Sequence, residues 1–237
     1  MNGLLTETDL TTEQVETLAK VAINEVKIIG DMKIEDEGLK EKVTKYVLNI
    51  LKTQGTKGKA TADVLIDSVD YLYNDSSIED PELQGKIIDW INGLLTETNL
   101  ETEEVYNVAK IGIDQIEFTG NMDIDPALKT KIDDYIMNLY KTTDNVGNAQ
   151  KAIDIAIDSI NIISTNSNIT SDLKSQIEEW ATNLFIKAGK DVEAAEAVSV
   201  GVNAINVVAN SNGITGDAKG KIIEWIQGLF AEDVPLE

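Results

Sequence analysis

Apolar residues return along the chain in five similar stretches, which begin at Ile34, Ile78, Ile124, Ile169 and Ile214. Each stretch reads as an Ile, a capping Asp or Ser, and then a helical run. In that run apolar residues recur at offsets 0, 4, 7 and 11, counted from Leu39, Leu83, Leu128, Leu173 and Ala218. These offsets trace one face of an α-helix. Asp80 followed by Pro81, and Asp125 followed by Pro126, predict an N-cap and a first helical residue.

A second helix is predicted before each of these stretches. Its central apolar residues are Ile23, Ile66, Ile113, Ile157 and Val202. Short loops are predicted between the two helices, because the residues there are rich in Asn, Asp, Ser and Gly, which favour turns. The pattern therefore predicts an all-α chain of ten helices in five hairpins, with no strand.

The hairpins repeat at intervals of 44 or 45 residues. Because one hairpin cannot bury its own apolar face, stacked pairs of this length predict an α-solenoid. The period resembles that of HEAT and armadillo repeats, and this resemblance is one of period and pattern only. A single array over residues 1–237 is expected, with a half-repeat stub at 1–10 and repeats at 11–54, 55–98, 99–143, 144–189 and 190–237.

The chain begins out of phase with its own repeat. Residues 1–8 (MNGLLTET) match residues 91–98 (INGLLTET), which form the end of a second helix. The match favours a fragment of a longer array, with a degenerate N-terminal cap as the alternative.

The composition excludes several kinds of chemistry. The formal charge is −22, and the basic residues are 20 lysines with no Arg, His or Cys. A nucleic-acid partner is not expected, because that surface needs a basic stripe. Zinc sites, disulfides and thiol or imidazole catalysis are excluded as well. No cofactor is indicated, and no apolar run suggests membrane insertion.

One polar stripe follows the otherwise apolar first helices. Its centre, one residue after each apolar centre, is always Asp or Asn, although these residues are poor helix formers. The acidic members are candidate binding residues: Asp63, Asp67, Asp70, Asp114, Glu117, Asp154 and Asp158. The stripe has two interpretations. It is either a solvated edge or hydrogen-bonded ladder between repeats, or a recognition surface for a basic or polyhydroxyl partner.

An aromatic residue stands at offset 7 of every second helix: Tyr46, Trp90, Tyr135, Trp180 and Trp225. A structural wedge between repeats is the expected role. The alternative is a platform on which sugars stack, and it requires exposed rings.

Calcium binding is weakly indicated. Asn121, Asp123 and Asp125 have the spacing that opens an EF-hand loop, but Pro126 and Ile132 stand where Gly and Glu are needed. No metal ligands are assigned, and weak Ca²⁺ binding of another kind stays open.

Enzymatic activity fits the sequence poorly. A carboxylate pair can hydrolyse glycosides, but the acidic residues follow the repeat and no copy carries an odd polar insertion. The expected function is a non-enzymatic acidic scaffold, a spacer or protein-binding module of a longer cell-surface or extracellular protein, with a protein partner or self-association. The alternatives are a ligand- or Ca²⁺-binding repeat domain that uses the acidic stripe, and a designed repeat protein.

Overall fold

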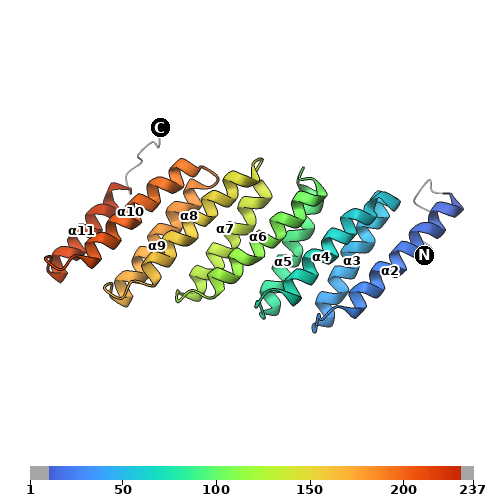
Figure 1. Ribbon diagram of the computed structural model, residues 1–237, viewed down its shortest axis with the longest axis horizontal. Coiled ribbons are helices and arrows are strands. Elements are labelled where there is room, and N and C mark those ends of the chain that lie inside the picture. The colour runs from blue at the N-terminus through green and yellow to red at the C-terminus, as the bar shows by residue number, and fades with distance from the viewer. Residues whose placement is uncertain (1–10, 231–237) are drawn as a thin grey trace. The chain divides into compact units, whose positions relative to one another are not determined.

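The computed structural model describes residues 11–230, and its regular structure there is entirely helical (Figure 1). The all-α prediction is confirmed for these residues, while the predicted stub at 1–10 lies outside them. The helices are α2 (Thr12–Asp31), α3 (Glu37–Gln54), α4 (Gly58–Asn74), α5 (Pro81–Glu97), α6 (Thr102–Gly120), α7 (Pro126–Thr142), α8 (Val146–Ser164), α9 (Ser171–Ala188), α10 (Val192–Asn210) and α11 (Gly216–Leu229), with a 3₁₀ turn at Gly55–Lys57. The even-numbered helices are the first helices of the predicted pairs, and the odd-numbered ones are the second.

Side chains next to the helix ends explain where several helices begin. Asp80 accepts a hydrogen bond from the Glu82 N–H at 2.9 Å, and Asp125 accepts one from the Ala127 N–H at 2.8 Å. Both were predicted as N-caps, and both are confirmed. Thr11 forms a reciprocal capping box with Gln14 at the start of α2, so a free helix N–H and the cap's own N–H are both satisfied.

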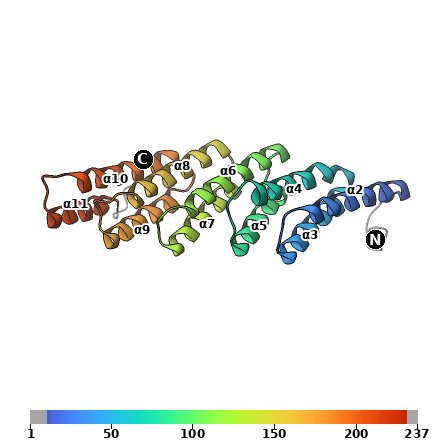
Figure 2. The ribbon, with the colours of Figure 1, turned by 60° about the horizontal axis from the view of Figure 1, so that its bottom comes forward.

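The chain divides into two compact units, Met1–Glu117 and Phe118–Glu237. In the first unit α2 packs against α3 and α4, and α3 packs against α4 and α5. In the second, α8 packs against α7, α9 and α10, and α10 also packs against α9 and α11 (Figure 2). Within each unit a hairpin therefore contacts the next hairpin. Stacking of all five pairs into one solenoid remains a prediction.

The buried side chains follow the predicted period. Four of the five central residues of the first helices are buried, and so are most residues at offset 4 of the second helices: Ile66, Ile113, Ile157 and Val202; Val43, Ile87, Ile132 and Ile177. Offset 8 is buried in every copy, although the sequence pattern did not single it out: Val47, Ile91, Ile136, Ala181 and Ile226.

Two expected core residues are exposed instead. Ile23 of α2 is 52% exposed and Trp225 of α11 is 65% exposed. The predicted wedge role is therefore wrong for Trp225, and Ile23 is the one central residue of a described first helix that is not buried. α2 packs against α3 and α4, and α11 packs against α10. Within residues 11–230, no further helical pair of the same unit lies before α2 or after α11 in the chain.

Among the described helices, α10 alone has the length and apolar composition that could cross a membrane. Its buried residues, which include Ala195, Val198 and Val202, are covered in a fold where α10 contacts α8, α9 and α11.

Candidate binding surface on the first helices

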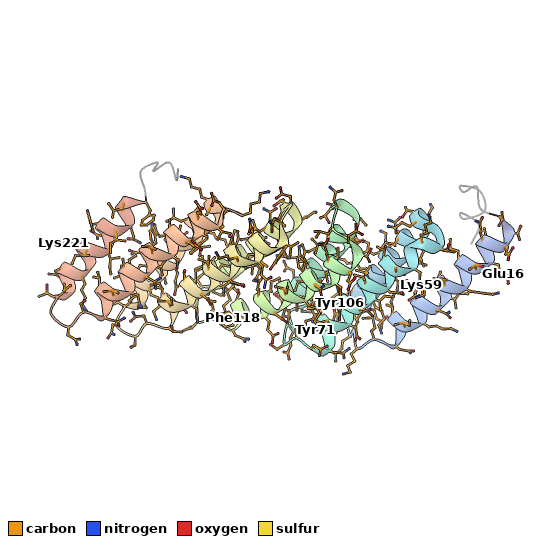
Figure 3. The ribbon with its side chains drawn as sticks, turned by 45° about the horizontal axis from the view of Figure 1, so that its top comes forward. Glu16, Lys59, Tyr71, Tyr106, Phe118 and Lys221 are labelled. Carbon is orange, nitrogen blue, oxygen red and sulfur yellow. The ribbon has the colours of Figure 1, made fainter. Side chains whose placement is uncertain are left out.

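The acidic stripe on α4 is partly neutralised by a lysine of the same helix. Lys59 Nζ lies 2.6 Å from Asp63 Oδ1 and 3.4 Å from Glu25 Oε1 on α2 (Figure 3). The hydrogen bond to Asp63 raises the pKa of Lys59, with a smaller contribution from Glu25. Glu25 is buried, so this lysine supplies a positive charge to a carboxylate that has left water.

Asp67 lies on α4 beside two other carboxylates of the stripe, Asp63 and Asp70. Partial burial raises its pKa, and the neighbouring charges of Asp63 and Asp70 raise it further. Asp70 accepts a hydrogen bond from Asn74 Nδ2 at 2.6 Å. Asp67 itself faces solvent, where a cationic group could relieve the repulsion between these carboxylates.

In the third repeat, stripe residues are bonded to the preceding helical pair. Asp114 accepts a hydrogen bond from the Tyr71 hydroxyl at 2.7 Å, which raises the pKa of that hydroxyl to about 12. Glu117 accepts from the Ser77 hydroxyl at 2.6 Å and from the Ser77 N–H at 3.1 Å. Asp114 thus connects α6 to α4, and Glu117 connects α6 to the loop that follows α4.

A lysine reinforces this junction. The Lys110 ammonium lies 4.5 Å from the centre of the Tyr71 ring and 5.6 Å from that of Tyr106. Figure 3 shows the two tyrosines on neighbouring first helices. Such cation–π contacts add to the attachment of one pair to the next.

The second unit has the same kind of connection, made with amides. Asn166 donates to Asn206, and Asn168 donates to Asn210, each at 2.6 Å. Lys151 of α8 pairs with Glu196 of α10 at 2.8 Å. Asp154 and Asp158 are exposed on α8. Asp114 and Glu117 thus make hydrogen bonds of the kind that one interpretation of the stripe, a ladder between repeats, describes.

The aromatic column supplies contacts between pairs. A methyl group built on Gly112 of α6 would overlap Cη2 of Trp90. On Gly201 of α10 it would lie 3.3 Å from Cη2 of Trp180 and 2.7 Å from Cε2 of Phe230. The Trp180 and Phe230 rings meet edge to face at 5.7 Å. Two tryptophans therefore pack against glycines of the following first helix, which fits the wedge role; the exposed Trp225 does not.

Lysines at offset 1 of the second helices close the helical pairs. Each donates to a carbonyl at the end of the preceding first helix: Lys40 to Gly30, Lys129 to Gly120, Lys174 to Ser164 and Lys219 to Ala209. In the second pair Gln84 occupies this position and donates to the Ile78 carbonyl. The ammonium groups satisfy carbonyls that a helix end leaves free and complement its negative dipole end.

One buried carboxyl was missed by the sequence reasoning. Glu178 of α9 is 2% exposed, and its Oε1 has no hydrogen-bond partner within residues 11–230. It lines a crevice of about 230 Å³ between α7 and α9, which the exposed Lys131–Glu179 pair spans at 3.2 Å. Burial raises the pKa of Glu178 to about 7, with Asp123 raising it and Lys174 lowering it.

The sequence did contain a signal for Glu178. Offset 5 of the second helices reads Thr44, Ile88, Asp133, Glu178 and Ile223. Two copies carry Ile at this buried position and two carry a carboxylate. A polar substitution at a buried position, unlike a polar insertion, was not considered from the sequence. A buried carboxyl that titrates near neutrality links the fold of the second unit to pH.

No cluster of three or more carboxylates suited to a metal ion occurs within the described part of the chain. Asp125, the last member of the EF-hand-like spacing, caps α7 through its hydrogen bond to Ala127. Its side chain has a helix-capping role that needs no ion.

Comparison with protein-family models, with curated proteins and with solved structures finds no match to the chain. The functional argument therefore depends on the residues and their contacts.

Proposed function

We propose that the chain is a non-enzymatic helical-repeat scaffold, whose five pairs stack as an α-solenoid and act as a spacer or as a surface for a protein partner. Support comes from the recurring polar positions, which are the residues a binding or catalytic role would use. Many of them hold helices together instead.

The observation that carries the proposal is the connection between successive pairs. Tyr71–Asp114 and Ser77–Glu117 join the second pair to the third. The Asn166–Asn206 bond joins the fourth pair to the fifth. Glu117 and Asn206 stand at the same place in the repeat, and each accepts a hydrogen bond from the preceding pair, one as a carboxylate and the other as an amide. This is expected where each unit depends on its neighbours for stability.

Deletion of one whole period tests the stacked array. Removing residues 55–98 joins α3 to the pair that follows and keeps first and second helices alternating. In a linear array the shortened chain should fold with an unchanged helical signal per residue in far-UV circular dichroism. It should still unfold cooperatively in urea, because each remaining pair keeps a neighbour of the right kind.

The matched control removes fewer residues but breaks the alternation. Deleting 76–98 takes out α5 alone and places two first helices in succession, so their apolar faces lack the correct partner. This variant should lose helical signal and unfold at lower urea. Equal tolerance of the two deletions, or better tolerance of the shorter one, would contradict the array.

A further inference from the structure

The last helical pair exposes four large apolar residues. Val200 and Val207 on α10 are 67% and 66% exposed, and Trp225 and Leu229 on α11 are 65% and 49% exposed. The residues lie seven and four positions apart, so each pair shares one side of its helix. We call these four residues the α10/α11 face.

Corresponding residues of earlier pairs contact the first helix of the next pair. Trp90 and Trp180, which align with Trp225, reach Gly112 and Gly201. Tyr71, which aligns with Val207, bonds to Asp114 of α6. The α10/α11 face therefore has the residues of a pair-to-pair interface, and no helix among residues 11–230 of the same unit covers it.

Among the described residues, the other half of such an interface is incompletely covered on α2. In α6 the face that contains Gly112 is buried, with Val105, Ala109 and Ile113 all fully inside. The corresponding α2 residues are Val15, Ala19 and Ala22, which are only half-buried, and Ile23, which is exposed. We call these four residues the α2 face.

We infer that the α10/α11 face binds the α2 face of a second copy of this chain, continuing the packing between successive pairs across two molecules. The inference rests on the proposed scaffold function. Trp225 would lie over Ala22, as Trp90 lies over Gly112 and Trp180 over Gly201. Ile23 would be covered, as Ile113 is in α6.

The two faces differ from one another, so the contact is heterologous and does not close on a pair of molecules. Each copy offers one face of each kind, and association should yield open-ended chains of copies. The net charge of −22 opposes this, since every copy repels the next. Added salt screens the repulsion, so longer assemblies are expected at higher ionic strength. Glu16 on α2 and Lys221 on α11, labelled in Figure 3, mark the helices that carry the two faces.

Sedimentation velocity of the full chain over a range of protein and salt concentrations tests the inference. The wild-type protein should sediment progressively faster as either is raised. Trp225→Glu and Ile23→Glu should each weaken association about tenfold or more, because each places a charge in the centre of one face. Both side chains are exposed in the single molecule, so the fold should survive, as circular dichroism can verify. Ile186→Glu replaces an exposed residue of α9 outside both faces and should leave association unchanged.

Mixing the two charged variants gives the sharpest result. The Ile23→Glu protein keeps its α10/α11 face, and the Trp225→Glu protein keeps its α2 face. Together they should form a 1:1 dimer that grows no further. A mixture that stays monomeric, or an Ile186→Glu variant as weakened as the other two, would overturn the inference.

A conservative substitution tests the ring position. Ala22→Gly places glycine at the position that accepts Trp90 and Trp180 in the same molecule, and it should tighten association severalfold. An unchanged or weaker association overturns the proposed register.

Deletion of residues 231–237 tests another occupant of the α10/α11 face. If the wild type stays monomeric and this deletion alone starts association, the chain's own last residues cover the face and the inference fails. If the variant lacking residues 55–98 folds while the wild-type chain does not associate, the inference fails and the proposed scaffold function stands.

Discussion

Glu178 occupies a position in α9 where other copies of the repeat bury isoleucine. A carboxylate there loses its water without gaining a hydrogen bond to Oε1 within the described chain. The acid therefore holds its proton more tightly when folded, and its pKa rises to about 7, mainly through burial. Lys174 opposes the shift and Asp123 adds to it.

Glu178→Gln should stabilise the protein at and above neutral pH and have little effect below about pH 4. The folded pKa lies above the unfolded value of 4.5, so the wild type binds more protons when folded and loses stability as pH rises from 4.5 to about 7. Glutamine does not titrate and avoids this loss, with a gain on the order of 2–3 kcal/mol at pH 8. Urea unfolding at several pH values measures it. Glu179→Gln, which makes the same substitution at the exposed neighbouring residue, is the control.

This residue also shows where sequence reasoning stopped. The offsets 0, 4, 7 and 11 describe the face that apolar residues mark most clearly. Offset 5, which holds Glu178, and offset 8, which is buried in every copy, were not among them. The acidic stripe was found because Asp and Asn recur there. Whether those carboxylates bond to a neighbouring pair, as Asp114 and Glu117 do, depends on distances between elements that periodicity does not give.

At the scale of helices, the fit of tryptophan against glycine sets how closely neighbouring pairs approach. Gly112 and Gly201 stand at the same place in their first helices, and each meets a tryptophan of the preceding second helix. Glycine normally weakens a helix interior by about 1 kcal/mol relative to alanine. Glycine at these positions is explained by aromatic rings that occupy the space of a side chain: Trp90 at Gly112, and Phe230 together with Trp180 at Gly201.

Gly112→Ala should therefore destabilise the protein, by about 1–3 kcal/mol, despite the better helix propensity of alanine. The added methyl group would overlap the buried Trp90 ring, which must shift. Gly220→Ala in α11 is the matched control, since nothing lies within 4 Å of the added carbon. That variant should gain up to about 1 kcal/mol. Urea midpoints of both proteins decide the matter, and a stabilised Gly112→Ala would contradict the packing argument.

Helix positions and caps could be predicted from the sequence because their causes are local. Asp–Pro pairs, apolar spacing and loop composition lie within a few residues of the structure they produce. The errors at Ile23 and Trp225 have another origin. Periodicity indicates which side of a helix is apolar, but it does not indicate whether another helix is present to cover that side.

For the molecule as a whole, charge is the dominant long-range term. The sequence holds 42 acidic residues against 20 lysines. The ion pairs described above are mostly exposed, and such pairs contribute little individually. The surplus of negative charge, in contrast, acts throughout the compact state and opposes folding.

Added salt should consequently stabilise this protein. At low micromolar concentration, where association is limited, the urea midpoint should rise between about 20 mM and 500 mM NaCl, because the Debye length falls from about 20 Å to about 4 Å and repulsion is screened over most of the surface. The same urea experiment tests whether the folded protein binds Ca²⁺. Because residues 11–230 contain no metal-binding cluster, millimolar CaCl₂ and MgCl₂ should shift the urea midpoint equally, through screening alone. A larger shift with Ca²⁺ than with Mg²⁺ would instead demonstrate a site selective for Ca²⁺ in the folded state, and it would revive the calcium-binding alternative for the acidic surface.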